Sequence, residues 1–406
     1  MGSCKKLEAL LGENLPFSLD WLPSDSHLVG GAVRDALLDR QKYYLDLDFV
    51  LPEAAISTAR KIANHYHGGF VILDEMRQIA RVVFGRVTVD FAQQEGGKLE
   101  EDLKRRDFTV NAIAFALQEQ VLIDPLQGLA DLAKKSLRMV SEKNLADDPL
   151  RLLRAYRQAA QLNFTIAPST RVALQNLAPL ISKVAAERVQ SELNYLLKAP
   201  LGQTWLEAAR ADGLLLPWLA SINAKKLSQA TSVEKSAQIL EASLQGFVVS
   251  TEELHIAKLS CLVSSIPEVA AQELSKLKYS RHEIKAVTTV LKSLPDLLHS
   301  QGEMSLGEQY FFFLKIGKFF PIIAIIAEIL QSEPWLMRSL GKRYQDAEDA
   351  VAHPRPLVSG HDLIQKLNLT PSPMIGKILM EIQLAQIEGR VTTFAEALRL
   401  AQELSH

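Results

Sequence analysis

The spacing of apolar and polar residues changes along the chain and divides it into two kinds of structure. Between His27 and Asp124, short runs rich in β-branched residues alternate with segments of helical spacing. After Ser141, apolar residues recur with helical spacing and strand candidates nearly vanish. The pattern predicts an α+β fold, with an N-terminal domain of mixed sheet and helices followed by a long all-α extension. The strand-like runs are 27–31, 45–51, 68–74, 79–85, 86–92 and 121–125, and the helical segments between them are 32–38 and 54–66.

Loop signals divide the helical part further. Stretches containing proline and glycine lie at 198–202, 294–302 and 353–356. A chain of 406 residues is long enough for about two to three domains of ordinary size. We therefore expect four regions, named here by their order along the chain: the head (1–140), the neck (141–200), the body (201–300) and the tail (301–406).

The most apolar stretch, 310–330, predicts a buried helix hairpin. Charged residues interrupt it at Lys315, Lys318 and Glu328, so its longest uncharged run is 319–327. A helix that crosses a bilayer needs about 20 apolar residues. We expect a break near Gly317 or Pro321 and no insertion into a membrane.

Composition and charge narrow the class of protein. Hydrophobic residues make up 48% and charged residues 23%, which excludes disordered and low-complexity classes. The net charge of -2 means that a polyanionic partner has to meet a local patch rather than a whole-chain field. The two cysteines, Cys4 and Cys261, occur in a chain without a secretory signal, so we expect free thiols and a cytoplasmic location.

A first candidate site lies where a predicted strand passes into a helix. Gly30 and Gly31 end the strand, and Arg34 follows in the helix. Paired glycines let the backbone approach a ligand closely, and a helix N-terminus favours anions, so a triphosphate fits this position. A simple tight turn between strand and helix is the alternative.

A second candidate site follows one helix later. In a strand, Asp46 and Asp48 project to the same face, about 7 Å apart at Cα, while Leu47 and Phe49 face the core. Two carboxylates held so close need a cation, and Mg²⁺ prefers carboxylates together with phosphate oxygens. Solvated acids on an amphipathic edge strand are the alternative.

Together these motifs resemble the opening motif of class II tRNA nucleotidyltransferases and bacterial poly(A) polymerases, within the polymerase-β-like superfamily. Further segments resemble the later motifs of the family in the same order, and a weaker likeness extends to 356–360 and the C-terminal helices. These segments are 105–112, Asp124 with Gly128 and Asp131-Leu132, 147–151, and Glu187-Arg188 with Glu192-Leu193.

The resemblance implies a polymerase-β-like head and assigns roles to individual residues. It implies that Asp46 and Asp48 are catalytic and hold a two-metal Mg²⁺ site, and that the tail binds tRNA. Arg105 is the more structural of the two adjacent arginines, and an ordinary ion pair at a helix start is the alternative for the second motif. The residues expected to bind the triphosphate and ribose are Gly30, Gly31, Arg34, Arg106, Asp107 and Asn111.

The fourth motif is the candidate nucleobase reader. Asp148 and Arg151 are three residues apart and so would share one face of a helix. A carboxylate accepts from an exocyclic amino group and a guanidinium donates to the adjacent ring nitrogen, which suits cytosine and adenine but not uracil or guanine. The family usually has Glu where this chain has Asp147. A surface salt bridge is the alternative interpretation.

Two other acidic positions are less specific. Asp90 is either a third carboxylate of the superfamily or a structural acid at a strand end, and both interpretations stay open. His361 and Asp362 resemble a metal-binding dyad, but they follow Ser359 and Gly360 at a probable helix start. We interpret them as a helix cap.

A short interval narrows the expected function. Only nine residues separate Asp90 from Glu100, whereas family members that add a complete CCA end carry a longer flexible loop here. The resemblance therefore implies an enzyme that adds two cytidines from CTP to tRNA, with ATP a possible second substrate. A full CCA-adding enzyme and a poly(A) polymerase are the alternatives within the family. A small-molecule nucleotidyltransferase and a non-catalytic helical binding protein are alternatives from other classes, and the oligomeric state stays open.

Overall fold

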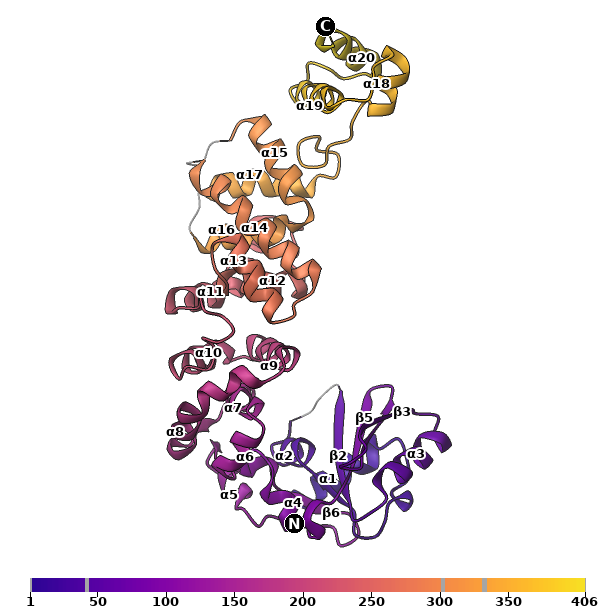
Figure 1. Ribbon diagram of the computed structural model, residues 1–406, viewed down its shortest axis with the longest axis vertical. Coiled ribbons are helices and arrows are strands. Elements are labelled where there is room, and N and C mark those ends of the chain that lie inside the picture. Colours follow the sequence, from indigo (N-terminus) through magenta and orange to yellow (C-terminus); the bar gives the residue numbers. More distant parts are fainter. Residues whose placement is uncertain (1, 41–43, 301–303, 331–333, 406) are drawn as a thin grey trace. The chain divides into compact units, whose positions relative to one another are not determined.

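The computed structural model describes residues 2–40, 44–300, 304–330 and 334–405. It divides into two compact units, Met1–Pro217 and Trp218–His406. The first unit, indigo to magenta in Figure 1, contains the predicted head and neck, and the second contains the helices from orange to yellow.

A mixed seven-stranded sheet forms the centre of the first unit. Its order is β3-β4-β5-β2-β1-β6-β7, in which β2 and β5 are parallel and all other neighbours antiparallel. The predicted mixed sheet is confirmed, but the sequence analysis missed β6, whose three buried residues are too few to show alternation. The strands are β1 His27–Val29, β2 Leu45–Leu51, β3 Gly69–Asp74, β4 Ile79–Phe84, β5 Val87–Gln93, β6 Ala114–Ala116 and β7 Val121–Ile123.

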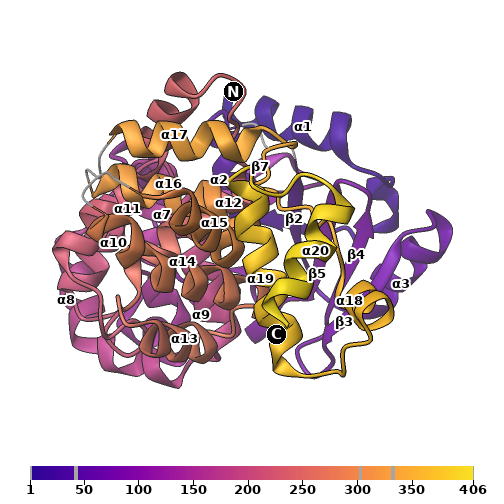
Figure 2. The ribbon, with the colours of Figure 1, turned by 90° about the horizontal axis from the view of Figure 1, so that it is seen from above.

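The alternation within β2 creates a core face and a polar face. Leu47 and Phe49 are buried as predicted, and the ring of Phe49 stacks on that of Phe91 in β5 at 5.9 Å. Helix α3 packs against β3, β4 and β5, and α2 packs against β1 and β2 (Figure 2). The carboxylates of β2 therefore lie on the opposite face of the strand from its aromatic core.

Helices build the rest of the first unit. The predicted helices 32–38 and 54–66 are confirmed as α2 and α3, and the change to helix near 141 is confirmed apart from the two-residue strand β9 (Thr165–Ile166), which pairs with β8 (Ser136–Leu137). The α-helices are α1 Gly2–Asn14, α2 Gly31–Leu37, α3 Ala55–His65, α4 Leu99–Lys104, α5 Gly128–Ala133, α6 Glu142–Asp147, α7 Leu150–Leu162, α8 Pro168–Leu177, α9 Ala186–Lys198 and α10 Gly202–Ala211.

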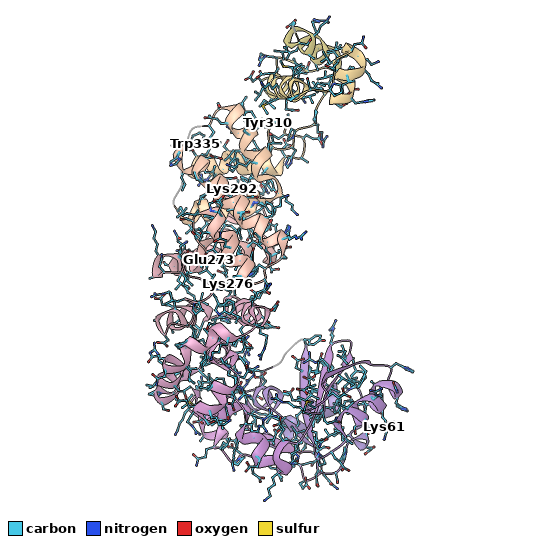
Figure 3. The ribbon with its side chains drawn as sticks, viewed as in Figure 1. Lys61, Glu273, Lys276, Lys292, Tyr310 and Trp335 are labelled. Atoms are coloured by element: carbon cyan, nitrogen blue, oxygen red, sulfur yellow. The ribbon has the colours of Figure 1, made fainter. Side chains whose placement is uncertain are left out.

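In the described residues of the second unit, helices are the regular elements. In Figure 3, Glu273 and Lys276 lie on its helix α13; the Glu273 carboxylate accepts the backbone N–H groups of Ser221 and Ser264, and Lys276 lies over the Trp218 ring. The helices are α11 Ala224–Ser243, α12 Thr251–Leu262, α13 Pro267–Lys276, α14 Arg281–His299, α15 Leu306–Ile316, α16 Phe320–Ile329, α17 Pro334–Gln345, α18 Gly360–Leu367, α19 Pro373–Ile387 and α20 Phe394–Leu404.

The apolar segment in this unit is a core element. Within the described chain, the helical segment Leu306–Ile329 is long and apolar enough to cross a membrane, but 72% of its most apolar window is buried inside the protein. Its predicted break is confirmed at Gly317, which has φ +49°. Helix α16 packs mainly on α11, α12 and α14 rather than on α15, so the two halves do not form the predicted hairpin.

The C-terminal helices have a core of their own. Leu363, Ile378 and Ala397 belong to a buried cluster drawn from α18, α19 and α20. At the start of α18, Ser359 accepts from the backbone N–H of Asp362, and the Asp362 carboxylate accepts from that of Ser359. The interpretation of this acidic residue as a helix cap is confirmed.

Candidate active site

Three carboxylates share one face of the parallel strands β2 and β5. Asp46 and Asp48 alternate with the buried Leu47 and Phe49, and Asp90 lies directly opposite Asp48 in the register. Burial raises the pKa of Asp48 above its usual range; Arg106 opposes this shift, whereas Asp90 and Asp46 add to it. The face is therefore short of positive charge.

Asp90 has a cation partner that the sequence analysis missed. Arg81 lies opposite it in β4 and donates from Nε and Nη2 to the two carboxylate oxygens at 2.7 and 2.8 Å. This hydrogen bonding raises the pKa of Arg81 above its usual range. Asp90 thus combines the position of a third carboxylate with the ion pair of a structural acid.

Gly30 brings the backbone against the carboxylates. Its φ is +76°, and a Cβ atom there would lie 2.9 Å from Asp48 Oδ2 and 3.1 Å from Arg106 Nη1. The Arg106 side chain is held from its other side by Asp102, 3.3 Å from Nη2, while its buried Nε has no hydrogen-bond partner in the described chain. The motif glycine, the strand carboxylate and the arginine of the second motif therefore converge.

A buried polar network joins the first two motifs. Arg34 Nη1 donates to Asn111 Oδ1 at 2.6 Å and lies 3.4 Å from Gln158 Oε1, which also accepts from Asn111 Nδ2 at 2.9 Å. Asn111 Nδ2 donates to Asp107 Oδ1 as well, at 2.8 Å. The structure thus places Arg34, Asp107 and Asn111 together, and all three are buried.

Asp107 is the anionic centre of this network. Burial alone would raise the pKa of Asp107, but Arg154, the Asn111 amide and the Phe108 N–H group together lower it to about 2. Arg154 donates from Nε to Asp107 Oδ2 at 3.0 Å. This carboxylate is therefore ionised at neutral pH and fixes Arg154 in place.

Residues of the third motif, among them Gly128 and Asp131, pack against the segment that follows Asp107 in the second motif. Asp124 accepts the backbone N–H groups of Gly128 and Leu129 at the start of α5, and Asp131 accepts the Thr109 hydroxyl at 2.6 Å. A Cβ atom on Gly128 would lie 2.3 Å from the carbonyl oxygen of Thr109. Glycine is needed because α5 presses directly on the 3-10 turn Thr109–Asn111.

The expected base-reading residues lie close together, but not on one helix. Asp148 has an extended backbone and ends α6, and α7 begins only after Pro149, so the prediction of a shared helix face is wrong. The proline imposes this break, because it disfavours the helical conformation in the residue before it. The side chains still meet, with Arg151 Nε 3.9 Å from Asp148 Oδ2.

Further contacts fix this pair. Arg188 from the fifth motif donates to Asp148 Oδ2 at 3.1 Å. Arg151 Nη1 donates to the backbone carbonyls of Arg105 and Asn144 at 2.8 and 3.2 Å. Asp147, the position where the family has Glu, pairs instead with Lys143 at 2.5 Å.

An open cavity of about 1070 Å³ connects the second, fourth and fifth motifs. Arg106, which reaches the carboxylates of β2, is also part of its wall. Cations outnumber anions among the residues that line it, so the cavity suits an anionic ligand. These residues are Arg77, Glu95, Asp102, Arg105, Arg106, Asp107, Lys143, Asn144, Asp147, Asp148, Arg151, Arg154 and Arg188.

Comparisons with known proteins match this geometry. Three family models match in succession: the poly A polymerase head domain at 26–138, the probable RNA and SrmB-binding site of polymerase A at 163–225, and the putative tRNA nucleotidyltransferase domain 2 at 247–401. The CC-adding tRNA nucleotidyltransferase of Synechocystis sp. is 48% identical over 403 residues, 97% of each chain. The chain belongs to the class II tRNA nucleotidyltransferase and poly(A) polymerase family.

Solved structures of this family share the fold. A CCA-adding enzyme in complex with ATP has a TM-score of 0.71 at 22% identity, covering 92% of this chain and 88% of that one. The Thermotoga maritima CCA-adding enzyme in complex with tRNA has a TM-score of 0.67 at 22% identity, covering 94% and 91%. The predicted fold, a nucleotidyltransferase head with a helical extension, is confirmed.

Four residues of this tRNA nucleotidyltransferase site were missed from the sequence. Arg154 could have been found, because it lies one helical turn after Arg151 and so shares its side of α7. Asn144 and Gln158 carried no signal, because their partners come from distant parts of the chain. The partner of Arg81 is only nine residues away, but their contact depends on the register between β4 and β5.

We predict that Gly30→Ala lowers the free energy of unfolding by about 1–3 kcal/mol, because a side chain must adopt a strained backbone conformation and displace Asp48 or Arg106. Gly31→Ala is the matched control: its Cβ would meet only Arg34 Nη2 at 3.6 Å, within a helix. Chemical denaturation measures both variants. Equal stability of the two would contradict the close approach at Gly30.

Proposed function

We propose that this family member adds two cytidines from CTP to tRNA that lacks its CCA end. The observation that carries the proposal is the short connection between the carboxylate face and the cavity. Strand β5 ends at Gln93 and α4 begins at Leu99, so only residues 94–98 join them. The full-length likeness to a protein named as CC-adding supports the same specificity.

The connection is also turned tightly and tied to its surroundings through Glu95. Gly96 and Gly97 have φ values of +77° and +75°, which turn the backbone tightly between strand and helix. Glu95, between the strand and these glycines, forms an ion pair with Arg105 and lies 4.0 Å from Arg77. Such a connection supports a pocket of one shape rather than one that is reset from a pyrimidine to a purine.

Magnesium is part of the proposal, and the residues fit it. Asp46 and Asp48 present two carboxylates on one face, and the Asp48 carboxylate lies among other acids with Arg106 as its opposing charge. Mg²⁺ is usually bound by one or two carboxylates together with substrate phosphate oxygens, so two carboxylates are enough on the protein side. When bound, Mg²⁺ neutralises triphosphate charge and lowers the pKa of the attacking hydroxyl.

The chain's own residues would orient the nucleotide. In the proposed reaction the 3′-hydroxyl oxygen of tRNA attacks the α-phosphorus of CTP and pyrophosphate leaves. The backbone at Gly30 and Gly31 and the unpartnered Nε of Arg106 would bind phosphate oxygens. Arg34, Asp107 and Asn111 are proposed to take part in binding the triphosphate and ribose, and their shared network supports this by fixing the wall beside Arg106.

Asp148 and Arg151 are proposed to read the nucleobase. The carboxylate would accept from the exocyclic amino group, and the guanidinium would donate to the ring nitrogen beside it. Their position in the cavity wall supports this role, since Arg106 of the same wall reaches the β2 carboxylates. Asp90 is proposed as a third carboxylate whose charge Arg81 partly offsets.

The partner and location complete the proposal. We propose that the tail (301–406) contacts tRNA, with the head (1–140) catalytic, the neck (141–200) base-reading and the body (201–300) between neck and tail. The tRNA complex of the Thermotoga maritima enzyme supports an RNA partner. A cytoplasmic location is supported by Cys4 and Cys261, which form no disulfide.

We predict that Asp46→Asn and Asp48→Asn each lower nucleotide addition by more than about 100-fold while tRNA binding is retained, because each removes a proposed metal ligand. Glu101→Gln, an exposed carboxylate on α4 that pairs with Lys104, is the control. Single-turnover addition of labelled CTP is the measurement. Near-normal turnover in both Asp variants would rule out the metal-binding assignment.

We predict that Asp148→Ala and Arg151→Ala each lower the preference for CTP over UTP by about 1–3 kcal/mol, which is about 5- to 150-fold. Each variant removes one contact to the base edge, whereas contacts to tRNA remain. The measurement is kcat/KM for each nucleotide, with tRNA affinity determined in parallel. Unchanged selectivity in both variants would overturn the base-reading role.

We predict that the unmodified protein adds two cytidines and little or no terminal adenosine, even with ATP in excess. Gel analysis of products at nucleotide resolution measures this with tRNA lacking its CCA end, CTP, ATP and Mg²⁺. Inserting a longer family-type loop between Gln93 and Lys98 should allow some adenosine addition. Efficient formation of complete CCA ends by the unmodified protein would instead support a CCA-adding enzyme.

A further inference from the structure

Asn144 forms a buried clamp between the neck and the head. It lies in α6 with 8% of its surface exposed, and its side-chain amide donates to two backbone carbonyls, those of Lys104 at 2.7 Å and Arg106 at 2.8 Å. A side-chain amide has two N–H hydrogens, so its donor capacity is fully used.

The two carbonyls belong to a segment that needs such a partner. Helix α4 ends at Lys104, and the last carbonyls of a helix have no acceptor role within it. Asn144 donates to one of them, the carbonyl of Lys104, and also to the carbonyl of Arg106 just beyond the helix, across sequence separations of 40 and 38 residues. The backbone of 104–106 is therefore held by a side chain from another element.

The clamped segment in turn holds the proposed base reader. The carbonyl of Arg105, which lies between the two clamped carbonyls in sequence, accepts from Arg151 Nη1 at 2.8 Å. The backbone carbonyl of Asn144 itself accepts from the same nitrogen at 3.2 Å. The orientation of this guanidinium thus depends on two carbonyls whose relative position Asn144 fixes.

The same segment also carries Arg106, whose guanidinium lies beside Gly30, as does the Asp48 carboxylate. Asn144 is therefore connected through one short stretch of backbone to both ends of the proposed nucleotide site. A contact near only one end would affect either base selection or phosphate binding. The Asn144 contacts hold one backbone segment that contains Arg106 and borders Arg151, and so they fix the spacing between these two arginines.

We propose that Asn144 is a positioning residue for base selection: it fixes Arg151 against the 104–106 segment so that the guanidinium presents its free donors to the ring nitrogen of the base. This inference rests on the proposed function, because it acts through the proposed base reader. Asn144 touches no reacting atom. Its effect is on the orientation of Arg151.

The test measures CTP over UTP selectivity, as the ratio of kcat/KM values, in Asn144→Ala and in Asn144→His, whose ring N–H can replace one of the two donors. We expect about a tenfold loss for Asn144→Ala, the effect of one neutral hydrogen bond, and a smaller loss for Asn144→His. The loss should appear as a higher KM for CTP, with tRNA affinity unchanged.

A double-mutant cycle separates positioning from general destabilisation. If Asn144 acts through Arg151, Asn144→Ala should cause no further loss of selectivity in an Arg151→Ala background. Thr170→Val is the matched control, since it removes another buried hydrogen bond of the same unit, from the Met139 N–H to the Thr170 hydroxyl, outside the cavity wall. The control should keep the selectivity of the parent.

The outcomes are distinct. Parent-like selectivity in both Asn144 variants, an equal loss in Thr170→Val, or an additional loss on the Arg151→Ala background would each overturn the positioning role. If Asn144→Ala does not fold, the comparison of Asn144→His with Thr170→Val decides the question. A parent protein that adds no cytidine would refute the proposed function itself, which is a separate result.

Discussion

Repulsion among three carboxylates is the constraint on which the first unit depends. Asp46, Asp48 and Asp90 share one face of two neighbouring parallel strands, and burial limits how far water can screen Asp48. Part of the balancing positive charge comes from side chains of the fold itself. Arg81 bonds to Asp90 from β4, and Arg106, beyond the end of α4, places a positive charge near Asp48. The sheet register places Arg81 and the position of α4 places Arg106, so both are needed to offset the negative charge of the carboxylates.

A buried polar network extends this dependence into the neck. Gln158 and Arg154 lie on α7 and bond to Asn111 and Asp107 of the head, and Asn111 bonds to Arg34 beside the motif glycines. Leaving a buried polar group without its partner costs about 1–3 kcal/mol, so α7 cannot shift along the head without losing several such bonds. Helix α7, which carries Arg151 of the proposed base reader, is therefore fixed relative to the carboxylates.

The features that could be predicted from the sequence are those set by residues close together in the chain. The alternation of Asp46 to Phe49 set the faces of β2, and the Ser359 cap followed from four consecutive residues. Strand β6 was missed because three buried residues show no period, and Asp148 was misplaced because the helix break at Pro149 outweighs an i,i+3 spacing. Arg81 and Asn144 could not be found, since their partners are set by sheet register and by the packing of α6 on α4.

In the proposed function, base selection depends on α4 as much as on the two residues proposed to read the base. As the proposed base reader, Asp148 and Arg151 would present the same groups to cytosine and adenine, so this pair alone would not distinguish a pyrimidine from a purine. The choice between a pyrimidine and a purine would then depend on the width of the cavity. That width depends on how far the cavity wall can move. Helix α4 has only six residues. The five-residue connection from β5 leads directly into its start, and Asn144 donates to the carbonyl of its last residue, Lys104. The ion pair between Glu95 and Arg105 joins the segments that flank the helix. A helix held at both ends sets one pocket width, which matches a protein that adds one kind of base.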